Sequence, residues 1–292
     1  MKFTKMHGIG NDYIYVNCFE EKVSEPEKVS VVLSDVRKGI GSDGLVLIMP
    51  SDKADFRMRI FNADGSEAMM CGNATRCIGK YVYEKGLTDK EDITLETNSG
   101  IRYLHLTAVN GVVEAVTVDM GKAVLVPEDI PVNSDLDRFI SQPVEADGRT
   151  WSVTCVSMGN PHAVIFVGDT DSLDLEKTGP KFENHQLFPD RINTEFIQVI
   201  DSRTLKMRVW ERGSGETHAC GTGACASAVA AVLNGICPRD EEILIHLRGG
   251  DLTITYRSDE TVIMKGPAEF ICDGEVKDEY IEKAKENVVC RS

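Results

Sequence analysis

Short apolar runs bounded by Gly, Asn, Asp or Pro recur along most of the 292-residue chain. They are rich in Val, Ile, Thr and aromatic residues, which is typical of β-strands. In the first half we expect strands at residues 12–18, 45–49, 56–61, 93–95, 101–106 and 111–118. In the second half we expect them at residues 152–156, 163–167, 195–199, 205–210, 242–247, 252–256 and 261–265.

Only a few stretches have apolar residues spaced three to four positions apart, the pattern that indicates a helix. We expect helices at residues 26–36, 72–85, 134–140 and 222–233, and the charged tail at residues 275–285 is also helix-prone. Gly86 and the pair Asn234-Gly235 follow the two longest of these helices and are typical stop signals. The chain is therefore predicted to be α+β, with mostly antiparallel strands around a few apolar helices.

One short sequence occurs twice, at an offset of 207 − 58 = 149 residues. Residues 58–72 read Met-Arg-Ile-Phe-Asn-Ala-Asp-Gly-Ser-Glu-Ala-Met-Met-Cys-Gly, and residues 207–221 read Met-Arg-Val-Trp-Glu-Arg-Gly-Ser-Gly-Glu-Thr-His-Ala-Cys-Gly. Asn11 and Asn160 have the same offset. The chain is long enough for two domains, so we expect two pseudo-symmetric ones, each a curled sheet around a central helix. They span residues 1–120, joined by the tail 266–292, and residues 121–265.

Each repeat carries a cysteine, Cys71 or Cys220, at the start of its apolar helix. The free N–H groups and partial positive charge of a helix N-terminus stabilise a thiolate and lower its pKa, and they can also hold a carboxylate. Gly72 and Gly221, which follow the cysteines, let a ligand approach closely. For one copy, a Cys-Gly that merely opens a buried helix would be the better interpretation. Two copies favour a pair of acid/base thiols, suited to removing a proton from one face of a carbon and returning it to the other.

Composition narrows the partners of the protein. Lysine and arginine number 32 against 47 aspartates and glutamates, so the net charge of −15 argues against nucleic acid or an anionic membrane surface. No apolar run reaches transmembrane length, and the N-terminal residues lack the apolar centre of a signal peptide. Nine cysteines without an export signal indicate reduced thiols and a cytoplasmic location. We expect a small-molecule substrate, and the sequence is compatible with a homodimer.

Two motifs suggest cofactor or metal sites, and neither is supported by its surroundings. Residues 39–44 fit the dinucleotide pattern G-x-G-x-x-G, but the pattern that follows predicts a strand rather than the required helix. Cys71 and Cys77 are six residues apart, and Cys220 and Cys225 are five apart, which does not match the usual spacing of zinc ligands. We therefore expect no metal and no cofactor.

Two segments resemble the signature of diaminopimelate epimerases. The first is Asn-Ala-Asp-Gly-Ser, four residues, then Cys-Gly-Asn-Ala-Thr-Arg at residues 62–76. The second is Glu-Arg-Gly-Ser-Gly-Glu-Thr, two residues, then Cys-Gly-Thr-Gly at residues 211–223. The similarity extends to residues 7–12, 159–162 and 193–195. It implies a cofactor-independent isomerase that interconverts LL- and meso-diaminopimelate for lysine and peptidoglycan-precursor synthesis, with its active site in the cleft between two α/β domains.

The resemblance also implies roles for the matched residues. Cys71 and Cys220 would be the catalytic acid and base, and Glu211 would bind the α-ammonium group. The α-carboxylate would be bound by Gly72, Asn73, Gly221 and Thr222. The far end of the substrate would be held by Asn11, Asn62, Asn160, Asn193 and Arg212. His162 and Glu211 would tune the thiol pKa values. Gly44 stands where many members have Gln, so we leave it out of the site.

Two other functions stay open at this point. Proline racemases and hydroxyproline epimerases share the expected fold and use two cysteines, but they resemble Met-Cys-Gly-His where this chain has Met-Cys-Gly-Asn at residues 70–73. They also have no use for an arginine that binds a distal carboxylate. A non-catalytic thiol-containing binding protein would leave two cysteines without a task.

Overall fold

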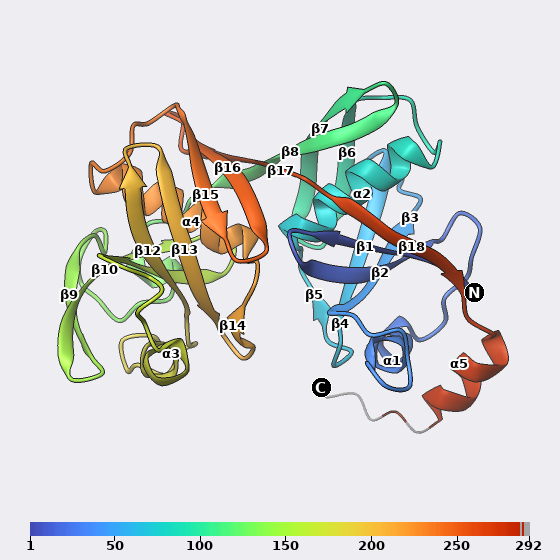
Figure 1. The fold of residues 1–292 in the computed structure, drawn as a ribbon, viewed down its shortest axis with the longest axis horizontal. Helices are drawn as coiled ribbons and strands as arrows, with labels where there is room; N and C mark the ends of the chain where they lie inside the picture. Colours follow the sequence, from blue (N-terminus) through green and yellow to red (C-terminus); the bar gives the residue numbers. More distant parts are fainter. Residues whose placement is uncertain (287, 289–292) are drawn as a thin grey trace. The chain divides into compact units, whose positions relative to one another are not determined.

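The computed structural model describes residues 1–286 and 288, and strands dominate it (Figure 1), which confirms the α+β prediction. The chain forms two compact units, one of residues 1–118 with the described residues from 266 onward, the other of residues 119–265. The helices are α1 Pro26–Ser34, α2 Gly72–Glu84, α3 Leu175–Glu183, α4 Gly221–Leu233 and α5 Asp278–Lys285, with a 3₁₀ turn at Pro127–Asp129. Residues 287 and 289–292, and with them Cys290, lie outside the described part.

The strands of the first half of the chain are β1 Lys2–Gly8, β2 Asn11–Asn17, β3 Gly44–Met49, β4 Phe56–Asn62, β5 Glu67–Ala68, β6 Asp92–Thr97, β7 Gly100–Val109 and β8 Val112–Lys122. Those that follow are β9 Gln142–Ala146, β10 Arg149–Ser157, β11 Pro161–Val167, β12 Asn193–Asp201, β13 Thr204–Glu211, β14 Gly215–Thr217, β15 Glu242–Leu247, β16 Gly250–Tyr256, β17 Thr261–Gly266 and β18 Glu269–Glu275. Every strand expected from the sequence is present, and β1, β5, β9, β14 and β18 go beyond the prediction.

The sequence repeat is also a repeat of strand register. In the first unit β2 and β3 are parallel and place Ile14 beside Leu45. In the second unit β11 and β12 are parallel and place Ala163 beside Thr194. Both residues of the second pair lie 149 positions after those of the first, since 14 + 149 = 163 and 45 + 149 = 194. A residue of one unit can therefore be matched with its counterpart in the other by this offset, from β2 to the end of α2.

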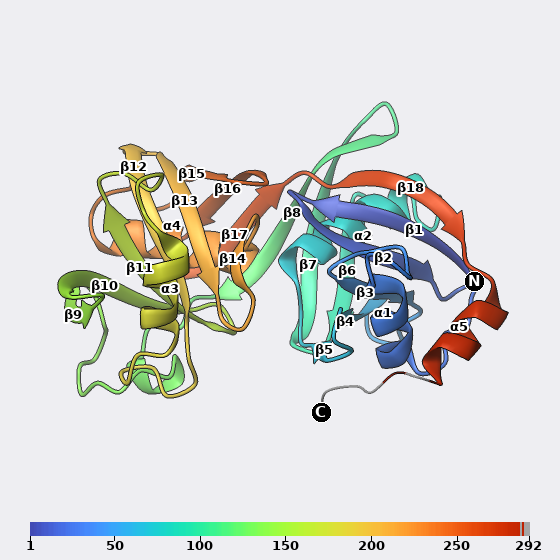
Figure 2. The same cartoon turned by 60° about the horizontal axis from the view of Figure 1, so that its bottom comes forward.

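Each unit buries one helix against its own strands (Figure 2). In the first unit α2 packs on β1 and β7, and in the second unit α4 packs on strands β10, β11, β12, β15 and β16. A Cβ at Gly79 of α2 would lie 2.9 Å from the end of the Leu106 side chain, so glycine allows a close approach that a larger residue would reach only by moving that leucine. The run of Gly, Ala and Ser in α4 serves the same purpose, because small side chains let strands come near the helix axis.

Two helix predictions need correction. Residues 134–140 are not helical; Phe139 anchors this segment by burying its ring in the core of the second unit, with Ile130 and Val132. The helix α3 was missed because Pro180 and Gly179 in its middle are typical of turns. Gly179 is required there, since an added Cβ would lie 2.3 Å from the Trp210 ring.

The tail packs on the first unit, where β18 pairs with β1 and α5 contacts α1. Ile281 of α5 is buried with apolar residues of α1, and the N-terminal ammonium of Met1 pairs with Asp278 at 2.8 Å. Within residues 1–286 and 288 there is no helix long and apolar enough to cross a membrane.

Candidate active site

The two cysteines occupy the same position in their units. Cys71 is the N-cap of α2 and Cys220 is the N-cap of α4, both in extended backbone with φ values of −138° and −129°. The amides of Gly72 and Asn73, like those of Gly221 and Thr222, therefore belong to the first helical turn, where backbone N–H groups have no partner within the helix. Each unit thus offers a thiol beside a set of anion-binding donors.

In the first unit, the side chain of Asn11 lies at the centre of a polar cluster. Its Oδ1 accepts hydrogen bonds from Asn73 Nδ2 at 3.1 Å and from the Cys71 thiol at 3.5 Å. Its Nδ2 donates to Asp43 Oδ2 at 2.6 Å. Three residues predicted for the site therefore come together here, and Asp43 is a neighbour that the sequence did not indicate.

A buried arginine of α2 holds this cluster in place through hydrogen bonds. The Arg76 guanidinium is fully buried and donates to Asn73 Oδ1 at 2.9 Å, to the Gly72 carbonyl at 3.2 Å and to the Pro267 carbonyl at 3.2 Å. Because Arg76 occupies Oδ1 of Asn73, it turns the Asn73 amide nitrogen toward Asn11. The cation thus fixes the first turn of α2 around the cysteine.

Asn62 and Gly44 lie at the paired ends of two adjacent strands. Asn62 ends β4, donates to Ser66 Oγ at 3.0 Å and faces Gly44 at the start of β3. A Cβ at Gly44 would lie 2.0 Å from the Phe61 carbonyl oxygen, and φ is +158°. This backbone therefore accepts no side chain at residue 44.

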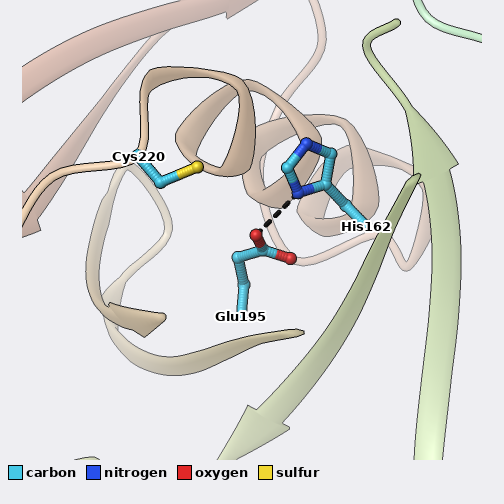
Figure 3. Close-up of side chains that lie close together, drawn as sticks. All are labelled: His162, Glu195 and Cys220. Atoms are coloured by element: carbon cyan, nitrogen blue, oxygen red, sulfur yellow. Dashed lines mark hydrogen bonds and ion pairs between the residues drawn. The ribbon is translucent and has the colours of Figure 1, made fainter. Parts of the chain in front are cut away.

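In the second unit, three chemically active side chains converge beside the start of α4 (Figure 3). The ligand atoms of His162, Glu195 and Cys220 lie within 4.8 Å of one another, and all three residues are buried. His162 Nδ1 lies 2.7 Å from Glu195 Oε1, and His162 Nε2 lies 3.0 Å from Asn160 Oδ1. The structure therefore joins two predicted site residues, Asn160 and His162, to a carboxylate that was not predicted.

The Cys220 thiol is surrounded by acidic groups. Burial raises its pKa well above the usual value, and the carboxylates of Glu211 and Glu195 raise it further. Hydrogen bonds from Thr222 and from the Gly223 amide, the latter at 3.4 Å, lower it without offsetting these effects. The expectation that the helix start lowers the thiol pKa is therefore wrong for Cys220, because burial and the two carboxylates raise it. Cys220 rests as a thiol, the form of an acid.

Glu211 and its neighbours lie at the end of β13. Burial raises the pKa of Glu211, and Thr217 donates a hydrogen bond to its carboxylate. Asn193 is buried, donates to the Pro161 carbonyl at 2.8 Å and accepts from the Arg212 amide at 2.9 Å. The Arg212 side chain is exposed, with Nη1 donating to the Asp190 carbonyl at 2.9 Å.

His, Glu and Cys are also the side chains that bind zinc. A cation between His162, Glu195 and Cys220 would have to replace the hydrogen bond between Nδ1 and Oε1 and displace the thiol proton. The three side chains are of the types that bind a metal. His162 and Glu195 already form a hydrogen bond with each other, however, and a metal would have to replace it.

The family model for diaminopimelate epimerase matches residues 3–126 and 154–271. A diaminopimelate epimerase of Acetivibrio thermocellus is 60% identical over 277 residues, which cover 94% of this chain and 98% of the relative. One of Agathobacter rectalis is 57% identical over 284 residues, with coverage of 94% and 99%.

Among solved structures, a phenazine biosynthesis protein of the PhzF family from Bacillus anthracis has a TM-score of 0.69 at 18% identity, covering 95% of this chain and 99% of its own. A probable proline racemase from Agrobacterium radiobacter has a TM-score of 0.72 at 13% identity, with coverage of 97% and 95%. These two similarities show a shared fold.

Proposed function

The chain belongs to the diaminopimelate epimerase family, and from this premise we propose that it interconverts LL- and meso-2,6-diaminopimelate without a cofactor. The observation that carries the proposal is the matched pair of thiols, Cys71 and Cys220, each at the N-terminus of the central helix of its unit. One thiolate removes the α-proton, and the other thiol delivers a proton to the opposite face of the same carbon. The raised pKa of Cys220 suits it to the role of proton donor.

The helix starts supply the electrostatic part of the reaction. When the C–H bond breaks, its electron pair spreads onto the α-carboxylate. The amides of Gly72, Asn73, Gly221 and Thr222 are donors that stabilise this developing charge. Glu211 accepts a hydrogen bond from the α-ammonium group, so that the substrate is held at its reacting centre.

Recognition of the distal amino-acid group falls to amides and one arginine. Asn11, Asn62, Asn160 and Asn193 bind its ammonium and carboxylate groups, and the exposed Arg212 guanidinium suits the carboxylate. Because the substrate is a free amino acid, we place the protein in the cytoplasm, and its partner is this small molecule.

Exchange of the α-proton in D₂O tests the proposal. NMR should show loss of the α-proton signal from LL-diaminopimelate and none from L-proline. Exchange with proline alone would assign the chain to the proline racemase type. A protein that exchanges neither substrate would be a non-catalytic binding protein.

A further inference from the structure

A buried carboxylate beside Cys220, that of Glu195, makes no contact with the substrate in the reaction described above. Glu195 lies on β12 with its side chain fully buried. Its Oε1 lies 2.7 Å from His162 Nδ1, whereas its Oε2 has no hydrogen-bond partner in the described part of the chain. Burying a carboxylate with one oxygen unpaired is unfavourable, so the residue calls for a functional explanation.

The first unit has no such carboxylate at the matched position. The offset of 149 matches Glu195 with Val46 and His162 with Tyr13, since 195 − 149 = 46 and 162 − 149 = 13. Glu195 and His162 are therefore a feature of the Cys220 unit alone, added to a framework that packs well with apolar and aromatic side chains.

The helix α4 differs from α2 at the position that faces Glu195 of β12. A Cβ at Gly223 would lie 2.5 Å from Glu195 Oε1 and 3.1 Å from Cys220 Sγ. The matched residue in the first unit is Ala74, since 223 − 149 = 74, and that unit has Val46 at the position of Glu195. Glycine weakens a helix relative to alanine, so Gly223 does not stabilise α4 itself. Its lack of a side chain leaves space for the Glu195 carboxylate.

The hydrogen bonds of His162 connect Glu195 to Asn160, a residue proposed to bind the substrate. Both ring nitrogens of His162 face oxygen atoms, Glu195 Oε1 on one side and Asn160 Oδ1 on the other. An amide oxygen only accepts, so Nε2 donates to Asn160 Oδ1, and a second hydrogen bond joins Nδ1 to Glu195 Oε1. With its Oδ1 occupied in this way, the Asn160 amide is held in one orientation and presents its Nδ2 hydrogens away from the imidazole.

We propose that Glu195 is a positioning residue of the Cys220 unit, which holds the His162 imidazole and, through it, orients the Asn160 amide for a substrate carboxylate. The role of Asn160 in this statement rests on the proposed function. Besides raising the pKa of Cys220, Glu195 acts on the substrate only indirectly, through His162, whereas Glu211 is proposed to contact the substrate itself.

A double-mutant cycle with a spectroscopic signature tests the proposal. Glu195→Gln should lower kcat/KM for LL-diaminopimelate at least ten-fold, mainly through KM, and should change kcat/KM less than two-fold when His162→Gln is already present. In ¹⁵N-histidine-labelled protein, a strongly downfield Nδ1 proton should be present and should disappear in Glu195→Gln. The Asn160 side-chain amide signal should shift in the same variant.

Asp251→Asn is the matched control. Asp251 pairs with His246 at 2.8 Å in the same unit, but Asp251 is exposed, His246 is half-buried and both lie outside the site, so kinetics and the downfield signal should not change. If Glu195→Gln does not fold, Glu195→Asp, which withdraws the carboxylate by one methylene, should show a smaller loss that again disappears with His162→Gln.

Equal losses in both backgrounds, or a downfield proton that survives Glu195→Gln, would overturn the proposal. Appearance of that proton only after the unmodified protein is dialysed against a chelator would replace the proposal with a metal site, because a bound cation excludes the hydrogen bond between Nδ1 and Oε1. The spectroscopic measurements need no turnover, so they decide the role of Glu195 even if diaminopimelate proves not to be the substrate.

Discussion

The two proposed catalytic cysteines differ in their surroundings. Cys71 is partly exposed and donates to the neutral amide of Asn11, whereas Cys220 is buried among carboxylates that raise its pKa. The proposed reaction needs a thiol that keeps its proton until it is delivered to the carbon, and the raised pKa suits Cys220 to that role.

Removing either thiol should abolish epimerisation. We expect Cys71→Ala and Cys220→Ala each to lower kcat by about 10³-fold or more, because the remaining thiol serves only one face of the carbon. Cys77→Ala and Cys225→Ala are the controls, since these cysteines are buried in α2 and α4 beyond the first residues of each helix. An active Cys220→Ala variant would contradict the assignment.

The charge of Glu211 should set the pH at which Cys220 reacts. The Glu211 carboxylate raises the pKa of Cys220, so removing its charge in Glu211→Gln should lower that pKa. The midpoint of the pH profile for iodoacetamide labelling of Cys220 should therefore move to lower pH. Cys71 in the same molecule is the internal control. A midpoint that stays in place or rises would show that Glu211 does not act on the thiol.

At the scale of elements, glycines decide where helices approach strands and rings. Gly179 lets α3 lie against Trp210, the residue before Glu211, and Glu183 at the end of α3 accepts a hydrogen bond from the Trp210 indole at 2.7 Å. The helix thereby supports the end of β13, where the proposed ammonium ligand is located.

Adding one methyl group at this contact should destabilise the second unit. Gly179→Ala should lower the free energy of unfolding by about 2 kcal/mol, because the rigid indole cannot yield. Gly168→Ala, where an added Cβ meets nothing within 4 Å, should change it by no more than about 0.5 kcal/mol. Tryptophan fluorescence during urea unfolding measures both, since both tryptophans, Trp151 and Trp210, lie in this unit. Equal stability of the two variants would refute the packing argument.

At the scale of the whole molecule, a duplicated framework carries two unlike sets of side chains. The offset of 149 matches Glu211 with Asn62, just as it matches Glu195 with Val46. The first unit therefore has neutral residues where the second has carboxylates. One architecture thus surrounds its two thiols with different groups, and the carboxylates of the second unit raise the pKa of Cys220.

Oxidation should join the two thiols if they serve one carbon as proposed. The proposed reaction requires both sulfur atoms to reach the same atom from opposite sides, and a disulfide needs a separation of about 2.05 Å. Mild oxidation without substrate should inactivate the protein and yield a Cys71–Cys220 peptide pair in non-reducing mass spectrometry. Reductant should restore activity, and bound substrate should protect. Inactive, oxidised protein in which both peptides are unlinked would contradict the two-thiol reaction.

The sequence by itself determined the features that depend on local signals. The strand pattern, the helices α2 and α4 and the cysteines at their starts follow from apolar spacing, Gly stop signals and the repeat. Segments with regularly spaced apolar residues can be recognised from the sequence without knowledge of their tertiary contacts. The helix α3 is not predicted by the sequence, because tertiary contacts with Trp210 override the turn-forming residues within it.

Only the tertiary structure decided the electrostatics of the site. Glu195 and His162 are 33 residues apart and meet because β11 and β12 pair in parallel at one register. Arg76 is a charged residue of α2, yet it is buried and donates a hydrogen bond to Asn73 Oδ1. The helix start alone predicts a lowered pKa for Cys220, and burial reverses that direction. Desolvation and charge proximity depend on which chain segments pack together, and no local pattern of residues specifies them.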